Sequence, residues 1–256
     1  MRAALAALLT VLLPSAARAY VRTTTAGYGC TGVARPLFWR ATTVPYVIDA
    51  AGSDDIMDSS AFDAVQASFQ TWQVSCSYLG FRFDGKLPDA PIGYVPGGSN
   101  VNAVKWIETG WTSSSRAVAI TLLTFQCTSG EIFDGDITLN GTFFHFTTSG
   151  AQGAQDVQNT VTHEVGHLIG FDHSPDPEST MYADAPAGET KKRDLTADDI
   201  QGVCDVYPNG QPPPPAPPSH HDDNFFGCAA FAGAPPLCGL VLAAALLLAL
   251  AYRRWR

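Results

Sequence analysis

Hydrophobic and polar positions along the chain form blocks that predict three helices. Apolar residues at positions 62, 65, 69 and 72 have helical spacing within residues 58–74. A second helix is predicted over 156–169, where one face would enter the core and carries Val157, Val161, Val165 and Leu168. A third helix is predicted to begin at Thr196, because a threonine followed by acidic residues is a favourable helix N-terminus.

Other blocks are rich in β-branched and aromatic residues, or alternate apolar with polar residues, and these predict strands. Residues 84–100 are instead rich in Gly, Pro, Asp and Asn, which indicates a loop. The predicted strands are 44–49, 79–83, 101–107, 117–125 and 131–140. The pattern therefore predicts one domain that contains both helices and strands.

The amino end has the pattern of an export signal. Arg2 precedes an apolar run from Ala3 to Pro14, and Ala17-Arg18-Ala19 has the small-x-small form of a cleavage site. Residues 1–19 are therefore predicted to be a secretory signal peptide, and Tyr20 the new amino terminus. An uncleaved membrane anchor is the alternative, but the apolar stretch is short for a membrane span.

The carboxyl end departs from the composition of the domain. Residues 208–226 begin with a run rich in proline and predict a stiff linker. Residues 227–256 contain Cys228, an apolar run from 237 to 250 and a basic end, and together resemble the MYXO-CTERM sorting signal of myxobacterial proteins. That resemblance implies cleavage by a sorting protease near Cys228 and attachment at the cell surface. A single-pass membrane anchor, with its arginines in the cytoplasm, is the alternative.

The domain is more acidic than the whole chain, because the two ends contain basic residues and no acidic ones. The whole chain has a formal net charge of −9 and is 46% hydrophobic, which is enough for a packed core. Five of the fifteen basic residues and none of the acidic residues lie in the ends, so the domain 20–207 with its linker has a net charge of −14. Such a surface argues against nucleic acid or an anionic membrane as its partner.

The candidate chemistry lies in the second predicted helix. His163 and His167 are four residues apart, so they project from one helical face and can bind one zinc ion. Glu164 is placed to reach a zinc-bound water without ligating the metal. Gly170 supplies a helix-ending residue that would turn His173 back as the third ligand. Three histidines and one open position are typical of a catalytic zinc site.

This extended motif, followed by Met181, resembles the metzincin zinc endopeptidases and within them the matrixins. The run from 195 to 207 is also similar to the last helix of matrixin catalytic domains, so the resemblance covers about residues 30 to 207. It implies an α+β, zincin-like domain with a twisted mixed sheet of about five strands, three helices and a cleft over the zinc helix. Met181 would lie under the histidines and Tyr182 would line the substrate pocket. Ala183 departs from the family, which usually has proline there.

The resemblance implies a secreted, surface-anchored, monomeric endopeptidase that hydrolyses peptide bonds in extracellular proteins, with Glu164 as general base. A surface adhesion module that binds zinc without turnover is the alternative from another class, and the intact Glu164 argues against it. A processing enzyme for one dedicated partner also remains open. Residues 117–125 would be the edge strand that pairs with substrate, although an interior strand explains their pattern equally well.

A calcium ion is left open at Asp134 and Asp136, whose oxygens suit that ion. The glycine-rich calcium loop and the additional histidines of the vertebrate members are not recognisable. His145 stands alone among aromatic residues and is interpreted as a packing residue rather than a ligand.

Four cysteines lie in the domain, and an exported chain would form two disulfides from them. Three connectivities are open, of which we expect Cys30–Cys76 and Cys127–Cys204. In matrixins a propeptide cysteine often occupies the zinc, which gives Cys30 an alternative role. The residues around Cys30 lack the family's pattern for that switch.

Overall fold

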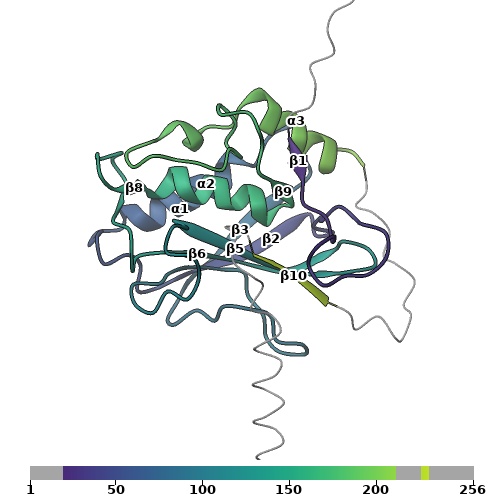
Figure 1. Ribbon diagram of the computed structural model, residues 1–256, viewed down its shortest axis with the longest axis horizontal. Helices are drawn as coiled ribbons and strands as arrows, with labels where there is room; N and C mark the ends of the chain where they lie inside the picture. The colour runs from purple at the N-terminus through teal and green to yellow at the C-terminus, as the bar shows by residue number, and fades with distance from the viewer. Residues whose placement is uncertain (1–19, 212–225, 231–256) are drawn as a thin grey trace, which may run out of the picture.

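The computed structural model describes residues 20–211 and 226–230. It contains three α-helices and a mixed sheet, which confirms the α+β prediction (Figure 1). The predicted signal peptide, most of the linker and the apolar run from 237 to 250 lie outside the described residues. Among the helices that are described, none combines the length and the apolar character that a membrane crossing requires.

The sheet has six strands, five of which lie where the sequence predicts them. In spatial order they are β10 (Phe226–Ala230), β5 (Ala119–Gln126), β6 (Ile132–Leu139), β4 (Ala103–Trp106), β2 (Thr43–Asp49) and β3 (Gly80–Leu87). Neighbouring strands from β6 to β3 are parallel, whereas β5 is antiparallel to β6. A parallel set with one antiparallel strand makes the sheet mixed.

The sixth strand, β10, was not expected, because it spans the boundary between the predicted linker and the sorting segment. It pairs antiparallel with residues 122–126 of β5. The outer edge of β5 from Ala119 to Thr121 has no strand partner within the described residues. The edge interpretation therefore holds for the first three residues of this strand, and the interior interpretation holds for the other five.

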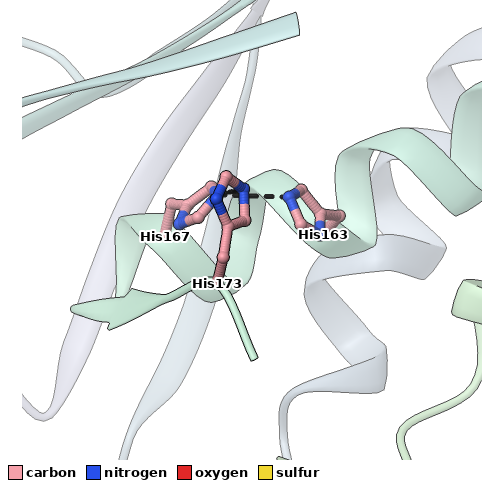
Figure 2. A group of neighbouring side chains, drawn as sticks. All are labelled: His163, His167 and His173. Carbon is pink, nitrogen blue, oxygen red and sulfur yellow. Dashed lines mark hydrogen bonds between the residues drawn. The ribbon is translucent and has the colours of Figure 1, made fainter. Parts of the chain in front are cut away.

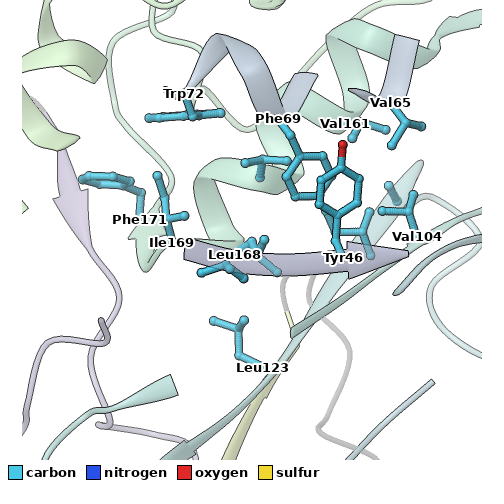
Figure 3. Packing of buried hydrophobic residues seen from close by; sticks show 14 of the residues in the cluster. Tyr46, Val65, Phe69, Trp72, Val104, Leu123, Val161, Leu168, Ile169 and Phe171 are labelled. Atoms are coloured by element: carbon cyan, nitrogen blue, oxygen red, sulfur yellow. The ribbon is translucent and has the colours of Figure 1, made fainter. Parts of the chain in front are cut away.

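The helices α1 (Ser60–Thr71) and α2 (Val157–Leu168) lie on the same side of the sheet and pack against each other (Figure 1). Between helices and sheet, Phe69 of α1 stacks on Tyr46 of β2 with ring centroids 3.7 Å apart (Figure 3). Val161 and Val165 of α2 are fully buried in the same core, as their spacing predicted. Each such side chain stabilises the fold by about 1.5–3 kcal/mol through its removal from water.

The carboxyl end of α2 is held by side chains from distant parts of the chain. Helix ends leave carbonyl oxygens without partners, and burial makes these costly. Trp39 Nε1 donates to the carbonyl oxygen of Leu168 at 2.8 Å, and the Tyr207 hydroxyl donates to that of Ile169 at 2.8 Å. Tyr207 ends α3 (Ala197–Val206), so the last helix and the segment that leads into β2 both fix the end of α2.

Short strands continue this support beyond the helix. β1 (Val21–Arg22) pairs antiparallel with β9 (Phe171–Asp172), directly before His173. The Thr23 amide donates to the Gly170 carbonyl at 3.0 Å. The start of the described chain therefore stabilises the turn that carries the third predicted ligand. Sequence patterns did not reveal β1, β9, β7 (Phe146–Thr147) or β8 (Gln155–Asp156), because each has only two residues.

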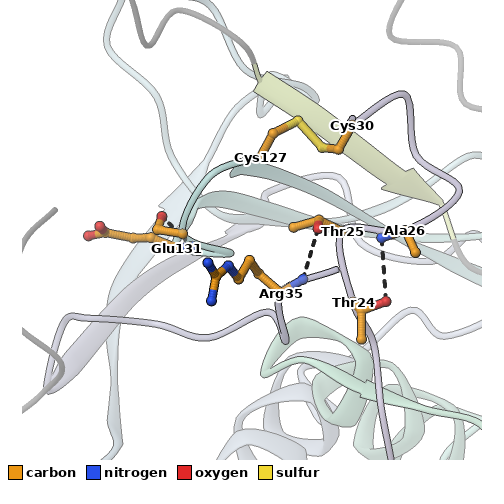
Figure 4. Close-up of a disulfide and its surroundings, with 8 residues drawn as sticks. Thr24, Thr25, Ala26, Cys30, Arg35, Cys127 and Glu131 are labelled. Atoms are coloured by element: carbon orange, nitrogen blue, oxygen red, sulfur yellow. Dashed lines mark hydrogen bonds between the residues drawn. A yellow bond between two sulfur atoms is a disulfide. The ribbon is translucent and has the colours of Figure 1, made fainter. Parts of the chain in front are cut away.

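The expected disulfide pairing is wrong. Cys30 is bonded to Cys127 (Figure 4). Cys76 is bonded to Cys204, and the Cα–Cα distance is 5.3 Å in both pairs. Residue 30 lies against the turn that follows β5, whereas residue 76 follows α1 and faces α3. Because Cys30 is in a disulfide, its thiolate is not available to a metal in this structure, which excludes the switch role.

Gly170 allows the turn for a steric reason that can be tested. Its φ is +89°, and an added Cβ would lie 2.4 Å from the Leu37 carbonyl oxygen. Gly153 has a similar φ of +87° but no atom within 4 Å of such a Cβ. We expect Gly153→Ala to cost about 1–2 kcal/mol from the left-handed backbone alone. Gly170→Ala should cost about 2–5 kcal/mol, because the clash adds to that strain.

Urea unfolding of the two variants and the parent measures this difference. Equal destabilisation by both substitutions would show that the approach of residue 170 to the Leu37 backbone is not a constraint.

Candidate metal centre

The three predicted ligands meet at one point. His163 and His167 project from one face of α2, and His173 follows β9 after the turn at Gly170 (Figure 2). The Nε2 atom of His167 lies 3.1 Å from that of His163 and 3.2 Å from that of His173. Within the described residues, these three are the one set of His, Cys, Asp or Glu side chains close enough together to share an ion.

Backbone carbonyls determine which ring nitrogens face the centre. His163 Nδ1 lies 2.7 Å from the Thr180 carbonyl oxygen, and His167 Nδ1 lies 2.8 Å from that of Phe171. A carbonyl accepts only from a protonated nitrogen, so in both rings Nδ1 carries the proton and Nε2 a lone pair. Burial lowers the pKa of all three imidazoles, to about 3 for His167, so they are neutral near pH 7.

This arrangement fits a zinc ion. Lone pairs about 3 Å apart repel one another unless a cation lies between them. Zn–N bonds of about 2.0–2.1 Å in a tetrahedron place the nitrogens roughly 3.3 Å apart, close to the separations here. The carbonyl partners of Nδ1 also orient the rings, as is usual for metal-binding histidines. The donor set is therefore three neutral nitrogens with the fourth direction open to a cavity.

Met181 packs against α2 at Gly166, where the lack of a side chain leaves room for it. A Cβ on Gly166 would lie 2.1 Å from the Met181 Sδ and 2.9 Å from Trp72. Met181 is 2% exposed and is not among the residues that surround the open position. This placement agrees with the expected apolar support under the ligands.

Asp199 fixes the loop that contains Met181. Its carboxylate accepts from the Thr196 amide at 2.9 Å, which completes a capping box at the start of α3, where the sequence predicted the helix to begin. The same carboxylate accepts from the Ser179 hydroxyl at 2.7 Å and the Thr180 amide at 2.9 Å. The last helix therefore positions the carbonyl of Thr180, which in turn orients His163.

Glu164 is buried beside the ligands and held by a residue that sequence reasoning missed. The hydroxyl of Thr121, on β5, donates to Glu164 Oε2 at 2.7 Å and lies 3.0 Å from the Glu164 carbonyl oxygen. Burial raises the pKa of Glu164 to about 7, although the Thr121 hydrogen bond and the Lys192 charge oppose the rise. A carboxyl with such a pKa can both take and return a proton near neutrality.

A cavity of about 430 Å³ opens at the centre. Its lining brings together α2, β5 and the segment after Met181, with the side chains of Ser114, Arg116, Ala117, Val118, Ala119, Gln155, Asn159, Thr160, His163, Glu164, His167, His173, Ala183, Asp184, Ala185 and Lys192. Tyr182, which we expected in this pocket, is not in the lining. Its carbonyl oxygen instead accepts a hydrogen bond from Lys192.

The lone histidine and the two calcium candidates of the sequence analysis do not line this cavity. His145, interpreted as a packing residue, is exposed, and its Nδ1 lies 2.9 Å from Asp55 Oδ1. Asp134 and Asp136 are buried on β6, where burial and mutual repulsion raise the pKa of the Asp136 carboxyl to about 8. Asp136 accepts from the amides of Gly93 and Ala103, and thereby fastens the predicted loop to the sheet.

Comparison with known proteins supports the resemblance. A family model described as Matrixin matches residues 38–208. Metalloendoproteinase 1-MMP of Arabidopsis thaliana is 46% identical over 57 residues, which are 22% of this chain and 15% of that protein. Metalloendoproteinase 1 of Glycine max is 39% identical over 61 residues (24% and 20%), and matrilysin of Homo sapiens is 41% identical over 46 residues (18% and 17%). The matched stretch therefore spans a fifth or less of each of these relatives.

Zinc binding can be tested by substituting one histidine of the predicted metal centre and, as a control, one histidine outside it. We expect the domain to bind one equivalent of Zn²⁺, and saturating zinc at about 100 times its dissociation constant to stabilise it by about 2.7 kcal/mol. His167→Ala should remove most of this effect, since the ion would keep only two nitrogens. His145→Ala should retain it, because that side chain is exposed and does not line the cavity.

Metal analysis and thermal unfolding with and without a chelator measure both quantities. Loss of zinc in the His145 variant, or zinc retention in the His167 variant, would contradict the assignment of ligands.

Proposed function

Because the chain belongs to the matrixin family, we propose that residues 20–207 form a zinc-dependent endopeptidase. The observation that carries this proposal is the placement of Glu164 in the same cavity as the three converging histidine nitrogens. A structural zinc site fills all four positions with protein ligands and has no need of a buried carboxyl beside the metal. A peptidase needs one to move a proton.

Zinc, when bound by His163, His167 and His173, would lower the pKa of a bound water and polarise the carbonyl of the scissile bond. Glu164 takes the proton of that water as general base. The protonated carboxyl then gives the proton to the leaving amine, so that Glu164 returns to its initial state. Thr121 orients the carboxylate in both steps through its hydrogen bond to Oε2.

The substrate would lie along β5. Ala117, Val118 and Ala119 line the cavity, and the outer edge of β5 next to them has no strand partner within the described residues. An extended polypeptide can pair with such an edge through main-chain hydrogen bonds, which give affinity without a strict sequence requirement. A peptide bound there would pass the metal centre.

We further propose that the enzyme acts outside the cell. Two disulfides support this, because such bonds persist in oxidising compartments. The export signal at 1–19 and the sorting segment at 227–256 support secretion followed by attachment at the cell surface. Calcium at Asp134 and Asp136 stays part of the proposal, since a divalent cation would relieve the repulsion between these carboxylates.

Glu164→Gln tests the mechanism directly. The variant keeps the size of the side chain but cannot accept a proton, so kcat/KM for a peptide substrate should fall about 100- to 10,000-fold. Zinc content should not change. Glu178→Gln, which alters an exposed carboxyl, is the matched control and should retain activity.

Activity is measured on a peptide library with the full chain. If the zinc-loaded, folded parent cleaves no peptide, the adhesion module is favoured. If activity survives Glu164→Gln or a zinc chelator, the proposed mechanism is wrong.

Thr121→Val tests how the base is tuned. The hydrogen bond from Thr121 lowers the pKa of Glu164, so its loss should raise that pKa. A smaller fraction of Glu164 would then be ionised at a given acidic pH, and the acidic limb of kcat/KM should move to higher pH. Thr121→Ser keeps the hydroxyl and should restore the parent profile. If the acidic limb of kcat/KM is the same in Thr121→Val as in the parent, Thr121 does not tune the pKa of Glu164.

A further inference from the structure

The cavity at the metal centre contains a buried cation that the mechanism does not use. Lys192 lies in the short 3₁₀ helix η1 (Lys191–Arg193) and is 2% exposed. Its side chain is part of the cavity lining, together with Asn159 and Thr160 of α2. A buried ammonium is unusual and costly unless it is paired.

The backbone around Lys192 is firmly docked onto α2. The Lys192 amide donates to Asn159 Oδ1 at 2.8 Å. Arg193 pairs with the helix-capping carboxylate of Asp156, with Nε 2.8 Å from Oδ1. These contacts hold η1 against the start of α2. The backbone of Lys192 is therefore held in place beside the cavity.

The charge of Lys192 has no close carboxylate. Its two neighbours in η1 have ion pairs, Lys191 with Glu178 and Arg193 with Asp156. Within residues 20–211, no carboxylate oxygen lies within 4.0 Å of Lys192 Nζ. This ammonium donates a hydrogen bond to the carbonyl oxygen of Tyr182. An ammonium has three donors, so two of them remain for other partners.

Three carboxylates act on Lys192 without forming an ion pair with it. Glu189, Glu164 and Asp184 act on Lys192 through space and raise its pKa, while burial lowers it. Glu164 is committed to Thr121, and Asp184 is exposed at the rim. An anion that entered the cavity would therefore compensate a charge whose contact within the described residues is a neutral carbonyl, that of Tyr182.

The rest of the lining offers polar groups beside small residues. Gln155, Asn159 and Thr160 contribute polar side chains to the lining, and Ala183 and Ala185 contribute small ones. An apolar side chain would cover the ammonium without offering it an acceptor, which is costly for a buried charge. A carboxylate would give a charge-assisted hydrogen bond.

We propose that Lys192 makes this cavity select a substrate side chain that ends in a carboxylate, with glutamate as the best fit. The proposal rests on the endopeptidase function above and deepens it by assigning the residue that decides specificity. A site built around a buried donor rejects ligands that lack the acceptor, by a larger factor than a purely apolar pocket can reach.

The first experiment measures cleavage of a randomised peptide library by the full-length, zinc-loaded protein, with cleavage sites read by mass spectrometry. We expect glutamate to be enriched about tenfold or more over leucine at one position next to the scissile bond. Lys192→Met should remove this enrichment and favour apolar residues there. Lys191→Met is the matched control, because the neighbouring lysine is ion-paired outside the cavity, and it should leave the preference unchanged.

The second experiment does not depend on turnover. Peptide hydroxamates with a glutamate, glutamine or leucine side chain are titrated calorimetrically into zinc-loaded protein. The parent should bind the glutamate compound about ten- to hundredfold more tightly than the leucine compound, and Lys192→Met or Lys192→Gln should abolish or invert this ratio.

The two experiments separate the two proposals. A chain that cleaves nothing but shows the binding ratio retains the role of Lys192 and loses the endopeptidase function. A parent that prefers leucine in both assays, or equal effects of the Lys191 and Lys192 substitutions, would overturn the assignment.

Discussion

The mutual approach of three imidazole lone pairs is the constraint on which this structure depends. Neutral nitrogens about 3 Å apart repel one another in a dry site, so the surrounding protein must hold them until a cation compensates. Two of the rings are held by carbonyls, those of Thr180 and Phe171. Those carbonyls belong to the loop before Met181 and to β9, so each ring is oriented from outside its own helix. The fold around α2 therefore serves largely to keep this helix, the turn at Gly170 and the methionine loop in one fixed relation.

Two glycines make that relation sterically possible. Gly166 lets Met181 and Trp72 approach α2 closely, and Gly170 lets the turn pass the backbone of Leu37. The supports converge from remote segments: Trp39 and Tyr207 satisfy the last carbonyls of the helix, and β1 pairs with β9. A site of this kind tolerates only small displacements of its ligands. Contacts from several distant segments are therefore needed to hold the histidines in position.

Burial then sets the chemistry of the cavity. It keeps the histidines neutral, brings the pKa of Glu164 close to 7 and leaves the Lys192 charge with few partners. The first two effects suit the movement of a proton between water and a leaving group. The third gives the cavity a preference for negative charge, although the domain surface is itself strongly acidic. Local burial, rather than net charge, therefore determines what the cavity can accept.

The sequence by itself determined the elements whose signal is local. Periodicity located α1, α2 and five strands, and Thr196 marked the start of α3. The spacing of His163, His167 and His173 predicted that these side chains come together, because four residues on a helix and a glycine-ended turn fix their relative positions. Only the tertiary structure decided the rest. The disulfide partners of Cys30 and Cys76 are 97 and 128 residues away, the hydroxyl of Thr121 reaches Glu164 from another element, and Lys192 enters the cavity from a three-residue helix. Such contacts arise from packing between distant segments, which leaves no periodic trace along the chain.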